Sequence, residues 1–304
     1  MSLTSIEFSS GTGRVHDVAT IRARLEAKLV ELLDTGSTPA NLKNAMNHAL
    51  LAPSKRLRPI LLYLISEPDH RFAEAALSLG AAVEMVHTAS LILDDLPCMD
   101  DADLRRQRPT THKAFGQATA ILAAIGLLTR AFGIIAELPE VAPATRARLA
   151  SVLATASGHQ GLVAGQEIDL NARDTLVDHE QIENLNWLKT GSLFVAAAEM
   201  GAILRDMPDA GVEHVRRFAR HLGLAFQTAD DLLDRTTNSA EIGKDTLKDG
   251  DKATLVSLFG ARRARMTCHE HLRVAEGALL DSGVSMAPIQ AVMDTYLRAK
   301  IGPE

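Results

Sequence analysis

One segment of the chain, residues 91–116, concentrates carboxylates and cations: LILDDLPCMDDADLRRQRPTTHKAFG. Its charged residues are Asp94, Asp95, Asp100, Asp101, Asp103, Arg105, Arg106, Arg108 and Lys113. A second acidic group, Asp230, Asp231 and Asp234, lies far downstream in AFQTADDLLD. Like charges about 4 Å apart cost on the order of 4 kcal/mol per pair at a surface-like dielectric. We therefore expect a cation between the two groups, and all-oxygen ligands favour Mg²⁺, which takes one or two carboxylates with waters and substrate phosphates.

A solvated acidic loop that caps the next helix is the alternative explanation for either run alone. Both runs adjoin an apolar, helix-like segment, and this repetition favours the metal site. Residues at i and i+4 face the same way on a helix. If the two helices are neighbours, their carboxylates face each other across a gap.

The residues before the first acidic run predict the helix that positions it. Residues 83–93 are apolar apart from Glu84, His87 and Ser90, which recur every three residues and form one polar stripe that Asp94 extends. Pro97 then ends the helix, because it cannot donate the next hydrogen bond. A histidine on an apolar helix is by default a core residue, but His87 lies about 10 Å from Asp94 along the same face, so a ligand contact is attractive.

A basic turn, Pro53-Ser54-Lys55-Arg56-Leu57-Arg58-Pro59, precedes another predicted helix. Its three cations lie where a helix begins, and helix N-termini favour anions. Taken alone this is a weak phosphate signal, since basic surface turns are common.

Composition excludes several classes. The chain has 304 residues, 46% of them hydrophobic and only 4% aromatic, which favours packed helices. A net charge of -6 gives no sign of a nucleic-acid partner. Cys98 and Cys268 cannot form a disulfide framework, which favours a reducing cytoplasm. We also expect a soluble protein without stable membrane insertion, because neither a signal-like start nor eighteen uninterrupted apolar residues occur.

Helical spacing recurs along the whole chain and period-two alternation does not, so we predict an all-α fold, a single large bundle and a single domain over residues 1–304. The expected helices cover residues 18–33, 39–51, 59–66, 72–94, 110–137 with a possible break near Gly126, 144–170, 179–188, 189–204, 208–234, 252–280 and 286–299.

DDLPCMDD and DDLLD, with KRLRP upstream and LRRQRPTTH downstream, resemble the motifs of the trans-isoprenyl diphosphate synthases. The likeness covers nearly the whole chain and is greatest to the bacterial geranylgeranyl diphosphate synthases. It implies an all-α fold around a central cavity, a homodimer, and a prenyltransferase that joins isopentenyl diphosphate to allylic diphosphates (dimethylallyl, geranyl, farnesyl). It also implies three Mg²⁺ ions per active site.

The resemblance assigns roles residue by residue. Asp94, Asp100 and Asp230 would bind Mg²⁺, with Asp95, Asp101, Asp231 and Asp234 supporting them. Arg105, Lys189 and Lys244 would hold the allylic diphosphate, and Lys55, Arg58, His87 and Arg106 would hold isopentenyl diphosphate. Thr190 and Gln227 would shield the carbocation, and Gln166 and Asp169 match a pocket motif. Lys189 as a solvated helix start and Gln227 as a core hydrogen-bonding residue are the ordinary alternatives.

Chain length is the most local inference. Residues four and five before Asp94 lie about 6 to 8 Å deeper along its helix, and these are Ser90 and Ala89, both small. A bulky aromatic residue there would stop growth early, so we predict geranylgeranyl diphosphate as product, with farnesyl diphosphate as the alternative. Val86 and residues 121–125 are candidates for the end of the tunnel.

Two positions depart from the family pattern: Pro53-Ser54 replaces Gly-Gly, and Asp251 precedes Lys252 where Gly is usual. Both put affinity in doubt, not the reaction. A terpene cyclase is the nearest rival, since Asp234, Thr237 and Glu241 match its metal spacing, but the chain has few aromatics to line a cation-folding pocket. A silent partner subunit is a third possibility, which the two intact aspartate motifs disfavour.

Overall fold

The computed structural model describes residues 18–33, 36–66, 72–171, 178–234, 256 and 260–301. The first helices are α1 (Val18–Leu33), α2 (Ala40–Leu50), α3 (Leu57–Ser66), α4 (Ala73–Asp94), α5 (Thr111–Phe115), α6 (Gln117–Ala136), α7 (Pro143–Ser157) and α8 (Leu162–Asn171). They are followed by α9 (His179–Asn186), the π-helix η2 (Trp187–Gly191), α10 (Ser192–Leu204), α11 (Asp209–Asp234), α14 (Ala261–Ser282), α15 (Met286–Met293), the π-helix η4 (Asp294–Arg298) and α16 (Ala299–Ile301). This architecture confirms the predicted all-α class.

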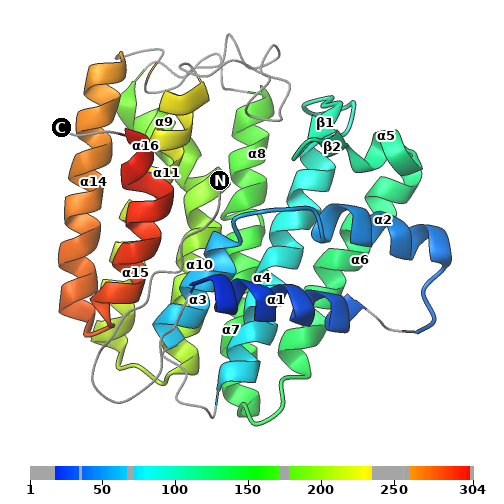
Figure 1. The fold of residues 1–304 in the computed structure, drawn as a ribbon, viewed down its shortest axis with the longest axis horizontal. Coiled ribbons are helices and arrows are strands. Elements are labelled where there is room, and N and C mark those ends of the chain that lie inside the picture. The colour runs from blue at the N-terminus through cyan, green and yellow to red at the C-terminus, as the bar shows by residue number, and fades with distance from the viewer. Residues whose placement is uncertain are drawn as a thin grey trace.

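The helix α4 is the centre of the bundle, and it packs against α1, α2, α3, α6 and α10. Fifteen of its residues are buried, from Ala75 to Asp94. A helix covered on most sides must be apolar nearly all round, which explains why its sequence carries so few polar residues. Most of the other long helices run alongside α4, whereas α1 and α2 cross them (Figure 1).

Within the described parts of the chain, two helices, α4 and α6, are long and apolar enough to cross a membrane by length and composition alone. In α4, 72% of the most apolar stretch is buried inside the fold, against 39% in α6. The apolar composition of α4 is therefore explained by its place in the core, whereas part of the apolar surface of α6 is exposed.

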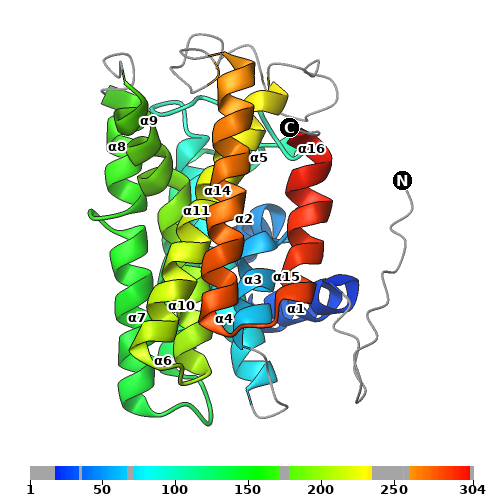
Figure 2. The same ribbon diagram turned by 90° about the vertical axis from the view of Figure 1, so that its left-hand side faces the viewer.

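Several helix boundaries differ from the prediction. The helix expected over residues 110–137 breaks at Gly116, whose φ of +85° suits glycine, and not at Gly126, which stays helical against Met46. The helix expected over residues 144–170 is divided between α7 and α8, which nevertheless remain nearly end to end (Figures 1 and 2). Five residues expected in ordinary α-helix form η2.

A small antiparallel hairpin, β1 (Leu104–Arg105) with β2 (Arg108–Pro109), was not predicted. Strands of two residues are too short to show an alternating pattern. The turn between them uses Arg106 and Gln107, both with positive φ (+54° and +63°), as a two-residue hairpin turn requires. The hairpin lies beyond the C-terminal end of α4 (Figure 1).

Candidate active site

The first acidic run lies where α4 ends and the chain folds back on itself. The backbone N–H of Asp100 donates to the carbonyl of Asp94 (2.9 Å), and that of Ala102 donates to the carbonyl of Asp95 (3.2 Å). Asp101 closes this loop with a φ of +46°. These bonds hold Asp100 beside the last turn of α4, so that three aspartates of the motif gather at one end of the bundle.

Burial makes this cluster electrostatically unfavourable without a counterion. Desolvation raises the pKa of Asp94 to about 6, with further upward contributions from Asp100 and Asp95, while Lys189 and Arg105 oppose the shift. The pKa of Asp95 is also raised, mainly by burial. A divalent cation would relieve this excess of negative charge, so the environment of Asp94 fits the predicted Mg²⁺.

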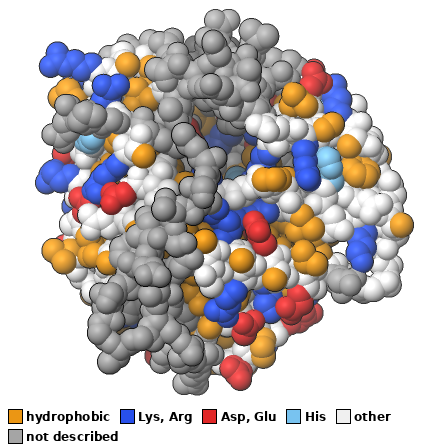
Figure 3. Space-filling model, in the orientation of Figure 1, with side chains coloured by type: hydrophobic (Ala, Val, Ile, Leu, Met, Phe, Trp, Pro, Cys, Tyr) orange, Lys and Arg blue, Asp and Glu red, His pale blue; other side chains and the backbone are white. Residues whose placement is uncertain are grey.

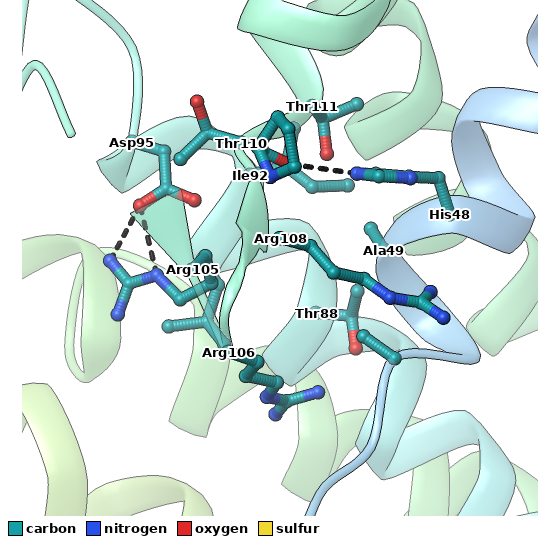
Figure 4. A pocket seen from close by; sticks show the side chains of 13 residues that line it. His48, Ala49, Thr88, Ile92, Asp95, Arg105, Arg106, Arg108, Thr110 and Thr111 are labelled. Carbon is teal, nitrogen blue, oxygen red and sulfur yellow. Dashed lines mark hydrogen bonds and ion pairs between the residues drawn. The ribbon is translucent and has the colours of Figure 1, made fainter. Parts of the chain in front are cut away.

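Asp95 already has a protein partner. Arg105 on β1 donates from Nε (2.9 Å) and Nη2 (2.5 Å) to Asp95 Oδ1, as Figure 4 shows. Charge-assisted pairs of this kind fix side-chain geometry. The hairpin therefore carries Arg105 to the acidic cluster, and Asp95 orients the guanidinium.

Basic side chains gather near His87 of α4. Arg58 packs over the ring of Phe194, with its Cζ 4.5 Å from the ring centroid. Burial lowers the pKa of Arg58 to about 10; Glu84 and Asp230 oppose that shift and Arg106 adds to it. Asp230 on α11 and the basic turn are thus close enough to interact, although the two lie far apart in sequence.

His87 lies among these cations. Burial lowers its pKa well below 6.5, and the guanidinium groups of Arg58, Arg106, Arg105 and Arg56 lower it further. A neutral imidazole can still donate one hydrogen bond to a phosphate oxygen. Lys55, the remaining predicted member of this group, is exposed. On the face shown in Figure 3, Lys and Arg side chains occur near the middle as well as toward the edges, with hydrophobic and acidic side chains between them.

The π-helix η2 presents Lys189 to the acidic cluster. Its Nζ pairs with Asp169 of α8, and its charge lowers the pKa of Asp94. Gly165 allows α8 to approach closely, since an added Cβ would lie 2.5 Å from the backbone N of Lys189. π-bulges occur frequently at functional sites, and here the extra residue places Lys189 between α8 and α4.

Gln166 follows Gly165 in α8, directly after the residue that approaches Lys189. It is buried, and neither its Oε1 nor its Nε2 makes a hydrogen bond to another described group. Buried amides normally have partners. Gln166 is therefore a candidate for contact with a bound molecule or water.

A chain of hydrogen bonds joins η2 to the second acidic run. Thr190 Oγ1 donates to Gln227 Oε1 (2.9 Å), and Gln227 Nε2 donates to Asp231 Oδ1 (2.9 Å). Asp230 is exposed and Asp231 half-buried. In Figures 1 and 2, α4, α8 and α11 end at the same end of the bundle, so the two acidic runs share that end.

Other predicted features lie outside the described residues. They are the side chain of Asp234 and the residues Thr237, Glu241, Lys244, Asp251 and Lys252. Among the residues that the structure describes, no three His, Cys, Asp or Glu side chains are grouped so as to hold a metal.

A cavity of about 30 Å³ lies between α2, α4 and the hairpin (Figure 4). It is lined among others by Thr88, Asp95, Arg106 and Arg108. The buried hydroxyl of Thr88 makes no hydrogen bond to another described group. A space of this size holds about one or two waters.

Ala89 and Ser90 lie one turn before Asp94 on α4. Ala89 is 3% exposed, and Ser90 is half-buried with its hydroxyl donating to the carbonyl of His87 (2.9 Å). Of the candidates for the tunnel end, Val86 is buried, whereas Ile121 and Ile125 are 40% and 51% exposed on α6.

Sequence reasoning missed the role of Glu84 and Arg56. Both residues are 2% exposed, and Arg56 Nη1 donates to Glu84 Oε1 (2.6 Å). The polar stripe on α4 pointed to Glu84, but a partner 28 positions away leaves no local pattern. The replacement of Gly-Gly by Pro53-Ser54 introduces no strained φ at either residue; the positive φ (+50°) is at Arg56.

Comparison with known proteins identifies the family of the chain. The family model described as polyprenyl synthetase matches residues 39–279. A geranylgeranyl diphosphate synthase of Pantoea ananas is 43% identical over 256 residues, covering 83% of each chain. A farnesyl diphosphate synthase of Bacillus subtilis is 41% identical over 242 residues, covering 78% of this chain and 82% of its own.

Two solved structures share the fold. An FPP/GFPP synthase from Zymomonas mobilis has a TM-score of 0.80 and 35% identity, and the match covers 94% of this chain and 97% of that one. A geranyltransferase from Helicobacter pylori, complexed with magnesium and isoprenyl diphosphate, has a TM-score of 0.82 and 26% identity, with 96% and 98% coverage.

Proposed function

Because this chain belongs to the polyprenyl synthetase family, we propose that it is a trans-prenyltransferase that condenses isopentenyl diphosphate with allylic diphosphates and makes geranylgeranyl diphosphate. The observation that carries the enzymatic part is the meeting of two kinds of charge at one end of α4. Carboxylates gather around Asp94, whose pKa they help to raise, and guanidinium groups gather around His87, whose pKa they help to lower. One region suits a cation and the other an anion.

The acidic side holds the allylic substrate in this proposal. Asp94, Asp100 and Asp230 would bind Mg²⁺, three ions per site, which supplies electrostatic stabilisation of the leaving diphosphate. Arg105, positioned by Asp95, and Lys189, positioned by Asp169, add fixed positive charge to the same group.

The basic side holds isopentenyl diphosphate through Lys55, Arg58, His87 and Arg106. Breaking the allylic C–O bond leaves a carbocation, which the double bond of isopentenyl diphosphate attacks before a proton departs. Thr190 and Gln227 would face the cation with their oxygens, and the departing diphosphate would accept the proton. Lys244 and Asp234 keep their predicted roles as ligands of the diphosphate and the metal.

Product length follows from Ala89 and Ser90, whose small side chains leave room beneath the allylic site. Farnesyl diphosphate is the second candidate product, since the Bacillus subtilis relative is a farnesyl diphosphate synthase.

Purified protein with Mg²⁺, isopentenyl diphosphate and each allylic starter should give twenty-carbon product. Ala89→Phe should shift it to farnesyl diphosphate and Ala89→Ser should not. Unchanged length in Ala89→Phe would exclude this wall as the limit.

We also propose a homodimer formed through α6. Ile121, Leu122 and Ile125 form an apolar face on this helix, 40%, 57% and 51% exposed. Such a patch on a long helix suits a partner helix. Leu122→Glu should give monomers by light scattering, whereas a substitution at exposed Glu26 of α1 should not; dimers in the Leu122 variant would place the contact elsewhere.

Location and domain structure complete the proposal. A cytoplasmic enzyme is supported by two free cysteines, exposed Cys98 and buried Cys268. A single domain is supported by one cluster of buried apolar residues that extends from Ile21 to Ile301.

A further inference from the structure

Arg56 holds an unusual backbone conformation between two residues assigned to substrate. Its φ is +50°, a region that side chains other than glycine adopt rarely unless neighbouring contacts fix it. Lys55 precedes it and Arg58 follows two residues later. The direction in which both cations point therefore depends on what holds Arg56.

The side chain of Arg56 supplies that restraint. Its Nη2 donates to the carbonyls of Leu50 (2.6 Å) and Ala52 (3.1 Å), at the end of α2, where helix carbonyls lack partners within the helix. Its Nη1 donates to Glu84 Oε1 (2.6 Å). Arg56 thus ties the basic turn to α2 on one side and to α4 on the other.

Glu84 gathers further parts of the same site. Its Oε1 accepts a hydrogen bond from Ser54 Oγ (3.3 Å) and lies 3.9 Å from Arg106 Nη2 in the hairpin turn. Ser54 Oγ in turn accepts from the backbone N–H of Arg56 (3.4 Å). One buried carboxylate therefore contacts the basic turn on both sides of Lys55 and also contacts the hairpin.

We infer that Glu84 is a positioning residue for isopentenyl diphosphate, which acts through Arg56 and Ser54 to set Lys55 and Arg58 and through Arg106 to set the hairpin. The inference rests on the proposed assignment of those cations to that substrate. Four guanidinium groups, those of Arg56, Arg58, Arg105 and Arg106, act on His87. Glu84 supports the charged forms of Arg58 and Arg106 against burial, so it also lets these cations gather before substrate arrives.

Steady-state kinetics with both substrates test the inference. Glu84→Gln keeps the shape of the side chain and removes its charge, so the KM for isopentenyl diphosphate should rise by about tenfold or more while the KM for the allylic diphosphate stays within about twofold. Ser54→Ala, a milder change at a half-buried residue, should shift the same KM in the same direction by a smaller factor. It keeps the test available should Glu84→Gln fail to fold.

Glu199→Gln is the matched control, since Glu199 is a buried carboxylate paired with Arg216 and has no assigned role. This variant should lower thermal stability and leave the KM values for isopentenyl diphosphate and for the allylic diphosphate unchanged. Unchanged KM values in both Glu84→Gln and Ser54→Ala would overturn the inference. It would also be overturned if Glu84→Gln raised the KM values of both substrates equally and lowered thermal stability as Glu199→Gln does. Absence of condensation by the unsubstituted protein would instead refute the proposed function.

Discussion

The buried carboxylate of Asp94 should make the metal-free protein less stable than it would be with a neutral side chain. Its folded pKa of about 6 exceeds the ordinary value of 3.8, chiefly because of burial. For an acid whose pKa is raised on folding, the penalty is absent below the unfolded pKa, grows between 3.8 and about 6, and is complete above. The difference corresponds to roughly 3 kcal/mol at pH 7.

Asp94→Asn removes this charge at nearly constant volume. In buffer with a chelator at pH 7, the variant should unfold at higher temperature and higher urea concentration than the unsubstituted protein, by up to about 3 kcal/mol. At pH 3.5 the two should differ little. Addition of Mg²⁺ and inorganic diphosphate should stabilise the unsubstituted protein far more than the variant, because binding to the folded state raises stability.

Glu26→Gln provides the control, because Glu26 is exposed on α1 and its substitution should change stability by no more than about 0.5 kcal/mol. A metal-free Asp94→Asn protein that is less stable at pH 7 would refute the reasoning. It would mean that Lys189 and Arg105 more than offset the desolvation of the carboxylate.

Two further predictions concern packing and pH. Gly165→Ala should destabilise the protein by about 1–3 kcal/mol and lower activity, because the added Cβ would lie 2.5 Å from the backbone N of Lys189. The control Gly277→Ala, in open space on α14, should be neutral or stabilising. Equal urea midpoints for the two variants would contradict the close approach at Gly165. His221 Nδ1 lies 3.0 Å from His271 Nδ1, and burial and that neighbour lower the pKa of His221 to about 4. A neutral imidazole is thus favoured in the folded state. The free energy of unfolding should therefore fall by roughly 1 kcal/mol as the pH is lowered from 6.5 to 4, a value reduced for partial exposure. His221→Asn should flatten this part of the plot of urea midpoint against pH, and parallel plots for the two proteins would contradict the lowered pKa of His221.

Most of the described helices were predictable, because surface helices bury one apolar face that recurs with the helical period and α4 is a long, largely apolar segment. The bounds of α1 agree with the prediction, and those of α4 differ by one residue. Local chemistry at the ends was harder to predict. Gly116 and Gly126 are equivalent in a pattern analysis, and only the positive φ of Gly116 distinguishes the true break.

Contacts that join distant segments could not be predicted. The π-helix η2 and the close approach of α8 to it at Gly165 leave no period in the sequence. The Arg56–Glu84 pair joins a turn to a helix across 28 positions. The aspartate motifs were found because like charges cluster within a few residues, whereas the buried acid that orders the basic turn is a single residue in an apolar helix.

The single additional residue in η2 is taken up by one widened turn, which changes the direction of the side chains within that turn. Deleting one residue from Trp187–Gly191 would restore regular α-helical winding and leave the segments on either side nearly in their present phase, because the π-turn absorbs one extra residue. Only the side chains within this turn would change direction, by up to about 100°. Lys189 would then leave Asp169, while Ser192 and the rest of α10 would keep their packing. A length change of one residue in this stretch is therefore equivalent to removing the lysine from the site, even though its letter would remain in the sequence.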